Sequence, residues 1–180
     1  MRKTPARIRC GGGHLSSRAV ANGLDTAVLR GMRTYGHQPA AERAVLAFTR
    51  LGEHGGVWFA LAAAGAALDE DRRDLFVRAA TAIGAAYAIN QLIKLVVGRR
   101  RPELEDLPPL VSTGSRISYP SAHASTSFAG AHALARLWPA APLYTAALAM
   151  ALSRPYMGVH YPSDVVAGAV LGTAVAELAA

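Results

Sequence analysis

Three short clusters of polar residues carry side chains that could act together on a phosphate group. The clusters are Lys94 with Arg101-Pro102, then Tyr119-Pro120-Ser121-Ala122-His123, then Ser153-Arg154 with His160 and Asp164. Cations neutralise the non-bridging oxygens of a phosphoryl group, one imidazole can attack phosphorus, and a second can protonate the leaving oxygen. The combination of residue types therefore indicates phosphoryl transfer through a covalent histidine.

In the first cluster, Lys94 stands near the end of an apolar segment, where a charged side chain is costly. Arg101 follows two helical turns later, on nearly the same face if the helix continues, and Pro102 then ends the helix. The two cations would point at one spot just outside the apolar region. The alternative is that both side chains only reach for lipid headgroups.

In the second cluster, Ser121 is a good N-cap and places His123 in the first turn of the helix that follows. Free backbone N–H groups and the positive end of the helix dipole make such a position a ready anion site. The alternative is a simple capped helix whose histidine faces outward. His132 falls on the opposite helical face and is not assigned to the site.

In the third cluster, Asp164 follows His160 by one helical turn, across a turn that contains Pro162. Its carboxylate could accept a hydrogen bond from one imidazole nitrogen, fix the tautomer, and leave the other nitrogen free to attack. Arg154 adds a third cation. An N-capping aspartate beside an unrelated histidine is the alternative for this cluster alone, but three clusters at the ends of three apolar segments favour one shared site.

Five apolar segments would position these clusters, and their lengths and small residues are typical of helices packed closely in lipid. They run over 55–68, 76–98, 123–138, 141–152 and 165–180, with prolines at several ends and a charged turn at 69–74. No alternation of useful length predicts a strand. We expect an all-α, membrane-embedded bundle of about five transmembrane helices.

The first part of the chain has a different character. Residues 1–23 are basic and aperiodic, which predicts a flexible tail, and 24–180 would form a single membrane phosphatase domain. Apolar residues at helical spacing over 24–51, interrupted at 36–39, predict two short amphipathic helices at the membrane surface or against the bundle. Ordinary surface helices of a soluble domain are the alternative.

The composition limits the kinds of partner that the chain could bind. Hydrophobic residues make up 52% of the chain, and the formal net charge is +7. Nearly all the positive charge is arginine, whose planar fork suits phosphate oxygens, so anionic lipid or nucleic acid could be a partner. Cys10 is the sole cysteine, which excludes an internal disulfide and a cysteine-based metal cage within the chain.

The order and spacing of the three clusters resemble the signature of the type 2 phosphatidic acid phosphatase superfamily, which also includes the vanadium haloperoxidases. That pattern is Lys, six residues, Arg-Pro; then Pro-Ser-Gly-His; then Ser-Arg, five residues, His, three residues, Asp. Ala122 replaces the family glycine, which leaves the donor geometry there open. The resemblance implies catalysis without a metal or other cofactor. It implies His160 as nucleophile held by Asp164, His123 as general acid, and phosphate binding by Lys94, Arg101, Arg154, Ser121 and the Ala122 N–H.

The segment 51–58 and the composition are similar to a small bacterial branch of that superfamily, which includes phosphatases of polyprenyl-linked phosphates. We therefore expect a multi-pass protein of the bacterial inner membrane, with a lipid phosphate as substrate, membrane lipids as partners and no nucleic acid. Glu53 and His54 would lie at a helix start on the membrane surface, or would flank the mouth of the site. The oligomeric state, the lipid and the side of the membrane stay open.

Two other interpretations explain part of the pattern. A vanadate-dependent haloperoxidase would have the same pocket in a soluble protein. A non-catalytic membrane protein whose arginines bind anionic lipid would explain the net charge of +7, but not two histidines and an aspartate at helix ends.

Overall fold

The computed structural model describes residues 17–179, and all of its regular elements are helices. They are α1 (Ser17–Thr34), α2 (Pro39–Arg50), the 3-10 helix η1 (Glu53–Gly55), α3 (Gly56–Leu68), α4 (Arg73–Val97), α5 (Ala122–Leu134), α6 (Ala140–Tyr156) and α7 (Pro162–Leu178). Within this range, pairing of the strand type is limited to a single bridge between Arg100 and Ile117. The prediction of an all-α fold is confirmed.

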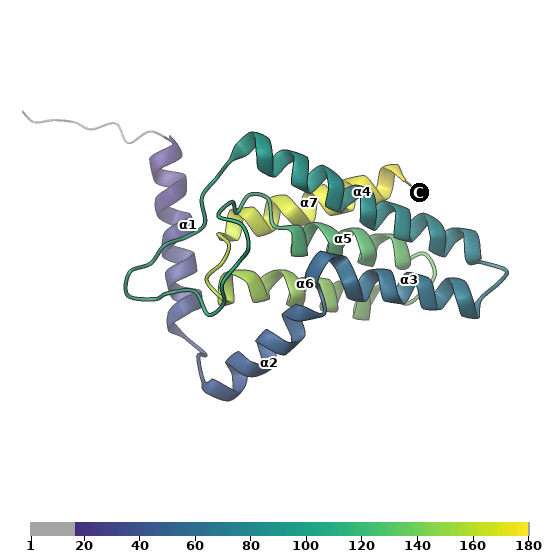
Figure 1. Cartoon of the computed structure of the whole chain (residues 1–180), viewed down its shortest axis with the longest axis horizontal. Helices are drawn as coiled ribbons and strands as arrows, with labels where there is room; N and C mark the ends of the chain where they lie inside the picture. Colours follow the sequence, from purple (N-terminus) through teal and green to yellow (C-terminus); the bar gives the residue numbers. More distant parts are fainter. Residues whose placement is uncertain (1–16, 180) are drawn as a thin grey trace, which may run out of the picture.

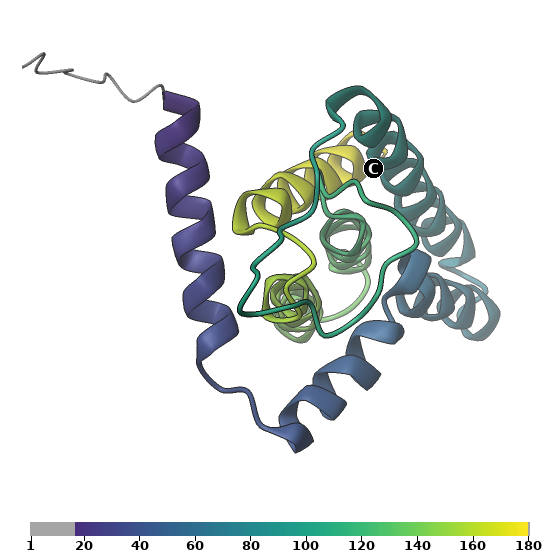
Figure 2. The same cartoon turned by 60° about the vertical axis from the view of Figure 1, so that its left-hand side comes forward.

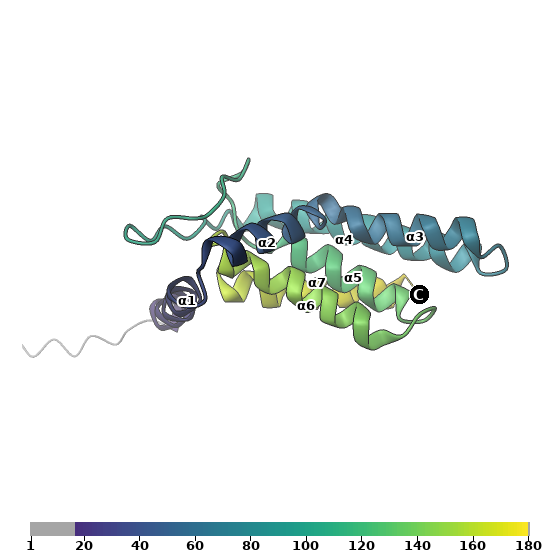
Figure 3. The same cartoon turned by 90° about the horizontal axis from the view of Figure 1, so that it is seen from below.

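Helices α3 to α7 run alongside one another, and each joins the next at one of the two ends of the bundle (Figure 1). Helix α5 lies in the middle, packed against α3, α4, α6 and α7. In the view from below, α3 and α4 form one layer, and α5, α6 and α7 lie beneath it (Figure 3). Because small residues make up most of α5, its neighbours approach its backbone closely.

The closest approach is between α5 and α7, where two glycines of α7 face the backbone of α5. A Cβ atom on Gly168 would lie 2.5 Å from the carbonyl oxygen of Ser121, and one on Gly172 would lie 2.1 Å from that of Ser125. Both distances are below van der Waals contact, so glycine is required at these two positions. The spacing of the pair is the small-xxx-small pattern of helices packed in membranes.

The interior of the bundle contains large aromatic residues. Trp58 and Phe76 are fully buried, and the Trp58 indole donates a hydrogen bond of 2.9 Å to the Ser127 hydroxyl. The outer surface is also apolar, with large exposed side chains along α4, α6 and α7. An exposed apolar surface of this kind fits contact with lipid tails.

Helix α4 is, among the described helices, the one that is long and apolar enough to cross a membrane by itself. Helices α3 and α5 have 13 residues each, and α6 and α7 have 17 each. The number of crossings therefore stays a prediction.

Helices α1 and α2 lie outside the bundle, and α1 stands across the end at which α5 and α7 begin (Figures 1 and 2). The two amphipathic helices were expected over 24–51, and the break between them falls at residues 35–38. Helix α1 begins earlier than expected, since 17–23, which we assigned to the tail, are helical. Residues 1–16, including Cys10, lie outside the described residues.

The long connection between α4 and α5 covers the same end of the bundle. It starts at Gly98, whose left-handed φ of 61° ends α4, and it passes over the starts of α5 and α7 (Figure 2). Two arginines of α1 tie this connection down. Arg33 donates a hydrogen bond of 2.7 Å to the Pro108 carbonyl, and Arg30 pairs with Asp106.

Candidate active site

A cavity of about 690 Å³ opens at the end of the bundle that α1, α2 and the 98–121 connection surround. The three sequence clusters meet in it, although they are far apart along the chain. Its lining includes Lys94, Arg101, Ala122, His123, Arg154 and His160, with Thr49, Glu53, His54, Tyr87 and Gln91 on the remaining walls. Two imidazoles and three cations from the sequence clusters thus face one space, together with Arg50 and His54.

His160 lies between α6 and α7, buried, with its two ring nitrogens in different surroundings. Nε2 lies 3.2 Å from the Arg101 guanidinium, which can only donate, so Nε2 must be the acceptor. The proton of the neutral ring then resides on Nδ1, which lies 3.5 Å from Oδ2 of Asp164. This distance is at the outer limit of a hydrogen bond, and no hydrogen bond satisfies the buried Nδ1 atom.

Burial sets the protonation state of this ring. Desolvation lowers the pKa of His160 to about 3, and the charge of Arg101 acts in the same direction, although Asp164 opposes both. The imidazole is therefore neutral near pH 7, and its unprotonated Nε2, which accepts from Arg101, belongs to a ring that lines the cavity. A neutral imidazole with a fixed tautomer is the form that can act as a nucleophile.

Asp164 does not line the cavity but lies behind His160, at the third position of α7. Its Oδ2 accepts the backbone N–H of Tyr161 at 2.9 Å, and its Oδ1 accepts a hydrogen bond of 2.8 Å from Arg99. The carboxylate is completely buried, and these donors compensate its charge. Asp164 therefore caps α7 and lies within 3.5 Å of the His160 ring.

His123 lies in the first turn of α5, as the sequence predicts, and its Nε2 contacts the Thr49 carbonyl at 3.2 Å. A carbonyl only accepts, so Nε2 carries a proton, and any further proton would sit on Nδ1. Ala122 lines the cavity as the first residue of α5. Alanine adopts helical backbone angles without cost, which explains why the family glycine is not needed here.

Ser121 is the N-cap of α5, as predicted, but it does not line the cavity. Its hydroxyl oxygen accepts the N–H of Ala124 at 3.4 Å, and the side chain is completely buried. Its backbone N–H donates to the Asp164 carbonyl at 2.9 Å, which joins the starts of α5 and α7. The structure thus gives Ser121 a capping position, and phosphate binding by its hydroxyl is not supported by this geometry.

The three cations reach the cavity from three elements. Lys94 extends from the last turn of α4, but Arg101 is not on that helix, because α4 ends at Gly98. Arg101 is held instead by the carbonyls of Ser115 and Val159, at 2.7 and 2.6 Å. The shared helical face that we expected is therefore wrong, while the convergence of the two charges holds.

Arg154 is held by a residue that lies outside the three sequence clusters. Its guanidinium donates a hydrogen bond of 2.9 Å to the hydroxyl of Thr49, which lies buried on α2 and also contacts the Ser153 hydroxyl at 2.9 Å. Thr49 therefore contacts both a cation through its hydroxyl and His123 through its carbonyl. The sequence predicted α2 only as an amphipathic helix at the membrane surface or against the bundle. It did not predict that Thr49 contacts Arg154.

Glu53 and His54 line the cavity, as the flanking position predicts, and they also lie at a helix start, in η1 just before α3. His54 has a φ of 53°, unusual for a residue other than glycine, and its Nδ1 lies 2.9 Å from the Tyr87 hydroxyl. His132 lies away from the site, as expected, and contacts Tyr144 and Glu177 at 2.9 and 2.7 Å. No group of three acidic, histidine or cysteine side chains among residues 17–179 is arranged to hold a metal ion.

These residues match a known family. The family model described as the PAP2 superfamily matches residues 75–180, which contain all three clusters. The chain belongs to the PAP2 superfamily. The resemblance that the clusters predicted is confirmed.

Among curated PAP2 relatives, decaprenylphosphoryl-5-phosphoribose phosphatase of Mycolicibacterium smegmatis is 41% identical over 133 residues, which cover 73% of each chain. Lipid A 4'-phosphatase of Bacteroides thetaiotaomicron is 35% identical over 94 residues, or 46% of this chain and 42% of the relative.

Two solved structures have the same fold. The crystal structure of Aquifex aeolicus LpxE has a TM-score of 0.75 and 24% identity, and the match covers 87% of this chain and 94% of that one. A transmembrane PAP2-type phosphatidylglycerolphosphate phosphatase from Bacillus subtilis has a TM-score of 0.72 and 24% identity, with 89% and 84% covered. The chain therefore shares the fold of transmembrane PAP2 phosphatases.

Proposed function

We propose that this PAP2 protein is a membrane lipid phosphatase that hydrolyses a phosphate ester through a phosphohistidine on His160. One observation carries the proposal. The Nε2 atom of His160 lies 3.2 Å from Arg101, in a cavity that also holds Lys94, Arg154 and His123. A nucleophile and an acid beside three cations are the parts that phosphoryl transfer needs.

In the first step, Nε2 of His160 forms a bond to phosphorus while the bond from phosphorus to the ester oxygen breaks. His123 enters the step protonated on both ring nitrogens and gives its Nδ1 proton to that oxygen, so the lipid leaves as a neutral alcohol. Lys94, Arg101 and Arg154 neutralise the phosphoryl oxygens, and the Ala122 N–H at the start of α5 adds a donor. These cations supply the charge stabilisation, so the proposed mechanism uses no metal or other cofactor.

In the second step, a water oxygen bonds to phosphorus, and the bond between phosphorus and Nε2 breaks. His123 takes a proton from the water, which restores the starting enzyme and releases inorganic phosphate. Asp164 holds the Nδ1 proton of His160 through both steps and stabilises the positive charge on the phosphorylated ring.

The surroundings of the cavity support a lipid substrate with a polar head. Leu92, Leu95 and Val96 are exposed on the last turns of α4, next to Lys94, so an acyl or prenyl chain can lie along α4 while its phosphate enters the cavity. The same exposed apolar surface disfavours the soluble haloperoxidase alternative.

The cavity is also much larger than a phosphate, which leaves room for the rest of the head. Glu53, His54, Tyr87 and Gln91 line part of the cavity. A carboxylate repels phosphate but accepts hydrogen bonds from hydroxyl groups. This part of the cavity suits a sugar, and the relative that is 41% identical is named for decaprenylphosphoryl-5-phosphoribose. The substrate that we propose is a phosphorylated sugar joined to a polyprenyl chain.

Phosphate release by the purified protein from a panel of compounds tests this proposal. The panel contains decaprenylphosphoryl-5-phosphoribose, phosphatidic acid, a polyprenyl pyrophosphate and ribose 5-phosphate, with His160→Asn as the control. We expect the polyprenyl-linked phosphosugar to have the highest kcat/KM, the variant to be inactive, and vanadate, a mimic of the transition state, to inhibit. Equal activity of the variant would exclude the histidine mechanism. An inactive parent protein would favour the non-catalytic, lipid-binding alternative.

The charge distribution supports a cytoplasmic site in a bacterial inner membrane. Helices α1 and α2 lie across the site end and add no crossing parallel to the bundle (Figure 1). Arginines near the membrane favour the cytoplasmic side. The site end carries Arg30, Arg33, Arg43, Arg50, Arg99, Arg100 and Arg116, against Arg72, Arg73 and Arg136 at the opposite end.

Cysteine labelling in intact cells tests this orientation, in a Cys10→Ser background. A membrane-impermeant maleimide should label Asp71→Cys, in the turn before α4, and leave Arg116→Cys unlabelled until the cells are opened. Labelling of Arg116→Cys in intact cells would place the site on the outer face.

A further inference from the structure

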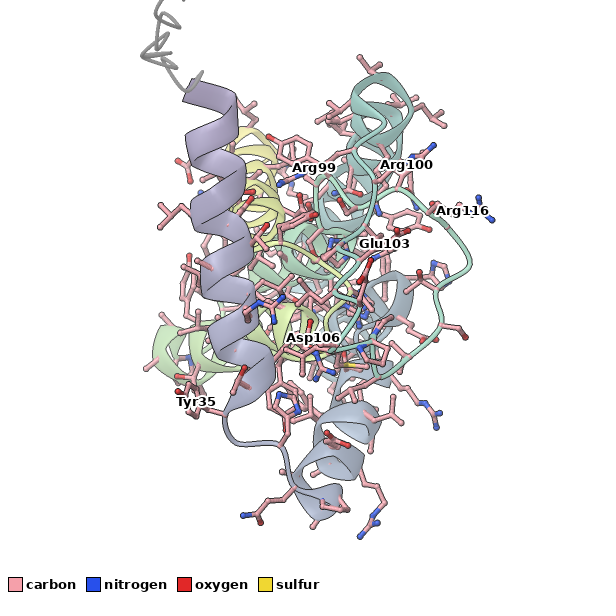
Figure 4. All side chains as sticks on the ribbon, turned by 90° about the vertical axis from the view of Figure 1, so that its left-hand side faces the viewer. Tyr35, Arg99, Arg100, Glu103, Asp106 and Arg116 are labelled. Carbon is pink, nitrogen blue, oxygen red and sulfur yellow. The ribbon has the colours of Figure 1, made fainter. Side chains whose placement is uncertain are left out.

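Arg99 joins two carboxylates that come from opposite ends of the described chain. One nitrogen of its guanidinium donates to Asp164 at 2.8 Å, and the other donates to Asp25 of α1 at 2.7 Å. Figure 4 looks onto this end of the molecule and shows Arg99 beside α1, whereas Arg116 points outward on the far side. The bidentate fork of arginine thus connects α1 to the carboxylate that orients His160.

Asp25 also holds the start of α7 directly. Its Oδ1 accepts the backbone N–H of Ser163 at 3.0 Å, and its Oδ2 accepts the Ser163 hydroxyl. The Arg99 guanidinium lies 4.0 Å from the centre of the Tyr161 ring, which limits its movement on another side. Asp25 and Arg99 are therefore both fixed at the turn that carries His160 and Asp164.

The charge of Arg99 also affects the interaction between Asp164 and His160. The Arg99 cation, alone beside Asp164, would weaken the attraction between that carboxylate and a positively charged imidazole. Asp25 places an equal negative charge on the other side of Arg99, so that the pair is neutral overall. The charge of Asp164 then remains available to His160 when its ring becomes cationic.

Both members of this pair are charged near neutral pH. Burial opposes the charged form of Asp25, but hydrogen bonds from Ser163 and Arg99 outweigh it and lower the pKa of the carboxyl. Burial likewise opposes the charged form of Arg99, and the two carboxylates outweigh it and raise the pKa of the guanidinium.

We propose that Asp25 and Arg99 are positioning residues of the phosphatase site. Together they orient Asp164 toward His160, and because their own charges cancel, the negative charge of Asp164 still acts on the His160 ring. Helix α1 then contributes one positioning residue, Asp25, to the site. This inference rests on the proposed phosphatase activity, and its residues touch neither the substrate nor the attacking nitrogen.

The test is a double-mutant cycle with Asp25→Asn, Arg99→Gln and the double variant, measured by phosphate release from the lipid phosphate on which the parent is most active. Asp25→Asn leaves an uncompensated cation beside Asp164, so we expect kcat to fall about tenfold or more, with KM within about twofold. The double variant restores neutrality and should be more active than Asp25→Asn. If the two residues act only as structural contacts, removing the second should lower activity further.

Arg30→Gln is the matched control, because it breaks another ion pair between α1 and the 98–121 connection, outside the cavity. We expect its kcat within about twofold of the parent. Thermal unfolding in detergent shows whether each variant is folded. If Asp25→Asn does not fold, the double variant is compared with Arg99→Gln: without the Arg99 cation, loss of the Asp25 charge should change kcat by less than about twofold, and a larger loss would overturn the inference.

Additive losses in the cycle, an effect on KM alone, or an equal loss in Arg30→Gln would overturn the inference. These outcomes differ from failure of the proposed function. In that case the parent itself releases no phosphate, or His160→Asn is as active as the parent.

Discussion

Thr49 offers a sharp test of the site, because no motif contains it and the structure gives it two contacts there. Its hydroxyl accepts a hydrogen bond of 2.9 Å from the Arg154 guanidinium, and the residue is buried on α2. Thr49→Val keeps the shape of the side chain but removes this acceptor. The backbone carbonyl that contacts His123 remains, so the substitution isolates the support of one cation.

The size of the effect follows from the chemistry of this bond. A hydrogen bond to a charged group contributes about 1.5 to 3 kcal/mol, and a loss of about 1.4 kcal/mol in transition-state stabilisation is a tenfold loss in rate. Since Arg154 is proposed to bind the phosphoryl group, we expect kcat/KM of Thr49→Val to fall by about 10- to 150-fold. Thr49→Ser keeps the hydroxyl and should stay within about threefold of the parent.

The assay is steady-state phosphate release in detergent by the parent and both variants, with thermal unfolding measured on the same preparations. Thr49→Val should unfold within a few degrees of the parent, because Ser153 keeps its second hydrogen bond, of 2.6 Å, to the Met150 carbonyl. A folded Thr49→Val protein with the kcat/KM of the parent would refute the argument that α2 supports Arg154.

Three further predictions concern stability, the departure from the family motif and pH. Gly172→Ala would place a Cβ 2.1 Å from the Ser125 carbonyl, so we expect a loss of about 2 kcal/mol or more, seen as a lower unfolding temperature in detergent. Ala122→Gly should keep activity within about threefold, because position 122 already has helical geometry. Burial lowers the pKa of folded His160 to about 3. The unfolded chain, with a pKa of about 6.5, binds this proton more readily, so stability should fall as pH drops below about 6.5, by up to about 1.4 kcal/mol per pH unit. His160→Gln should remove that part of the pH dependence in unfolding experiments.

The sequence predicted the helices of the bundle well. Each expected apolar segment corresponds to one helix, and the bounds differ by a few residues, because charged turns and prolines separate the segments. The residues of the three clusters were also found from sequence, since their spacing within each cluster is local. Six of them, Lys94, Arg101, Ala122, His123, Arg154 and His160, line one cavity.

The rest depends on contacts between distant parts of the chain. Thr49, Asp25 and Arg99 look like ordinary polar residues of amphipathic helices or a basic loop, and only the docking of α1 and α2 brings them to the site. The capping position of Ser121 was predicted, but the close packing of α5 against α7, which buries its hydroxyl, was not. Periodicity predicts that a helix is amphipathic without showing what its polar face contacts.

The most direct test of the account is the capture of the covalent intermediate. The parent protein is mixed with its lipid phosphate, quenched within milliseconds in alkali, in which phosphohistidine survives, and digested for mass spectrometry. The account predicts a phosphoryl group on the peptide that contains His160, and none in His160→Asn protein. Phosphate release by the parent with the label on another residue, or undiminished release by His160→Asn, would contradict it.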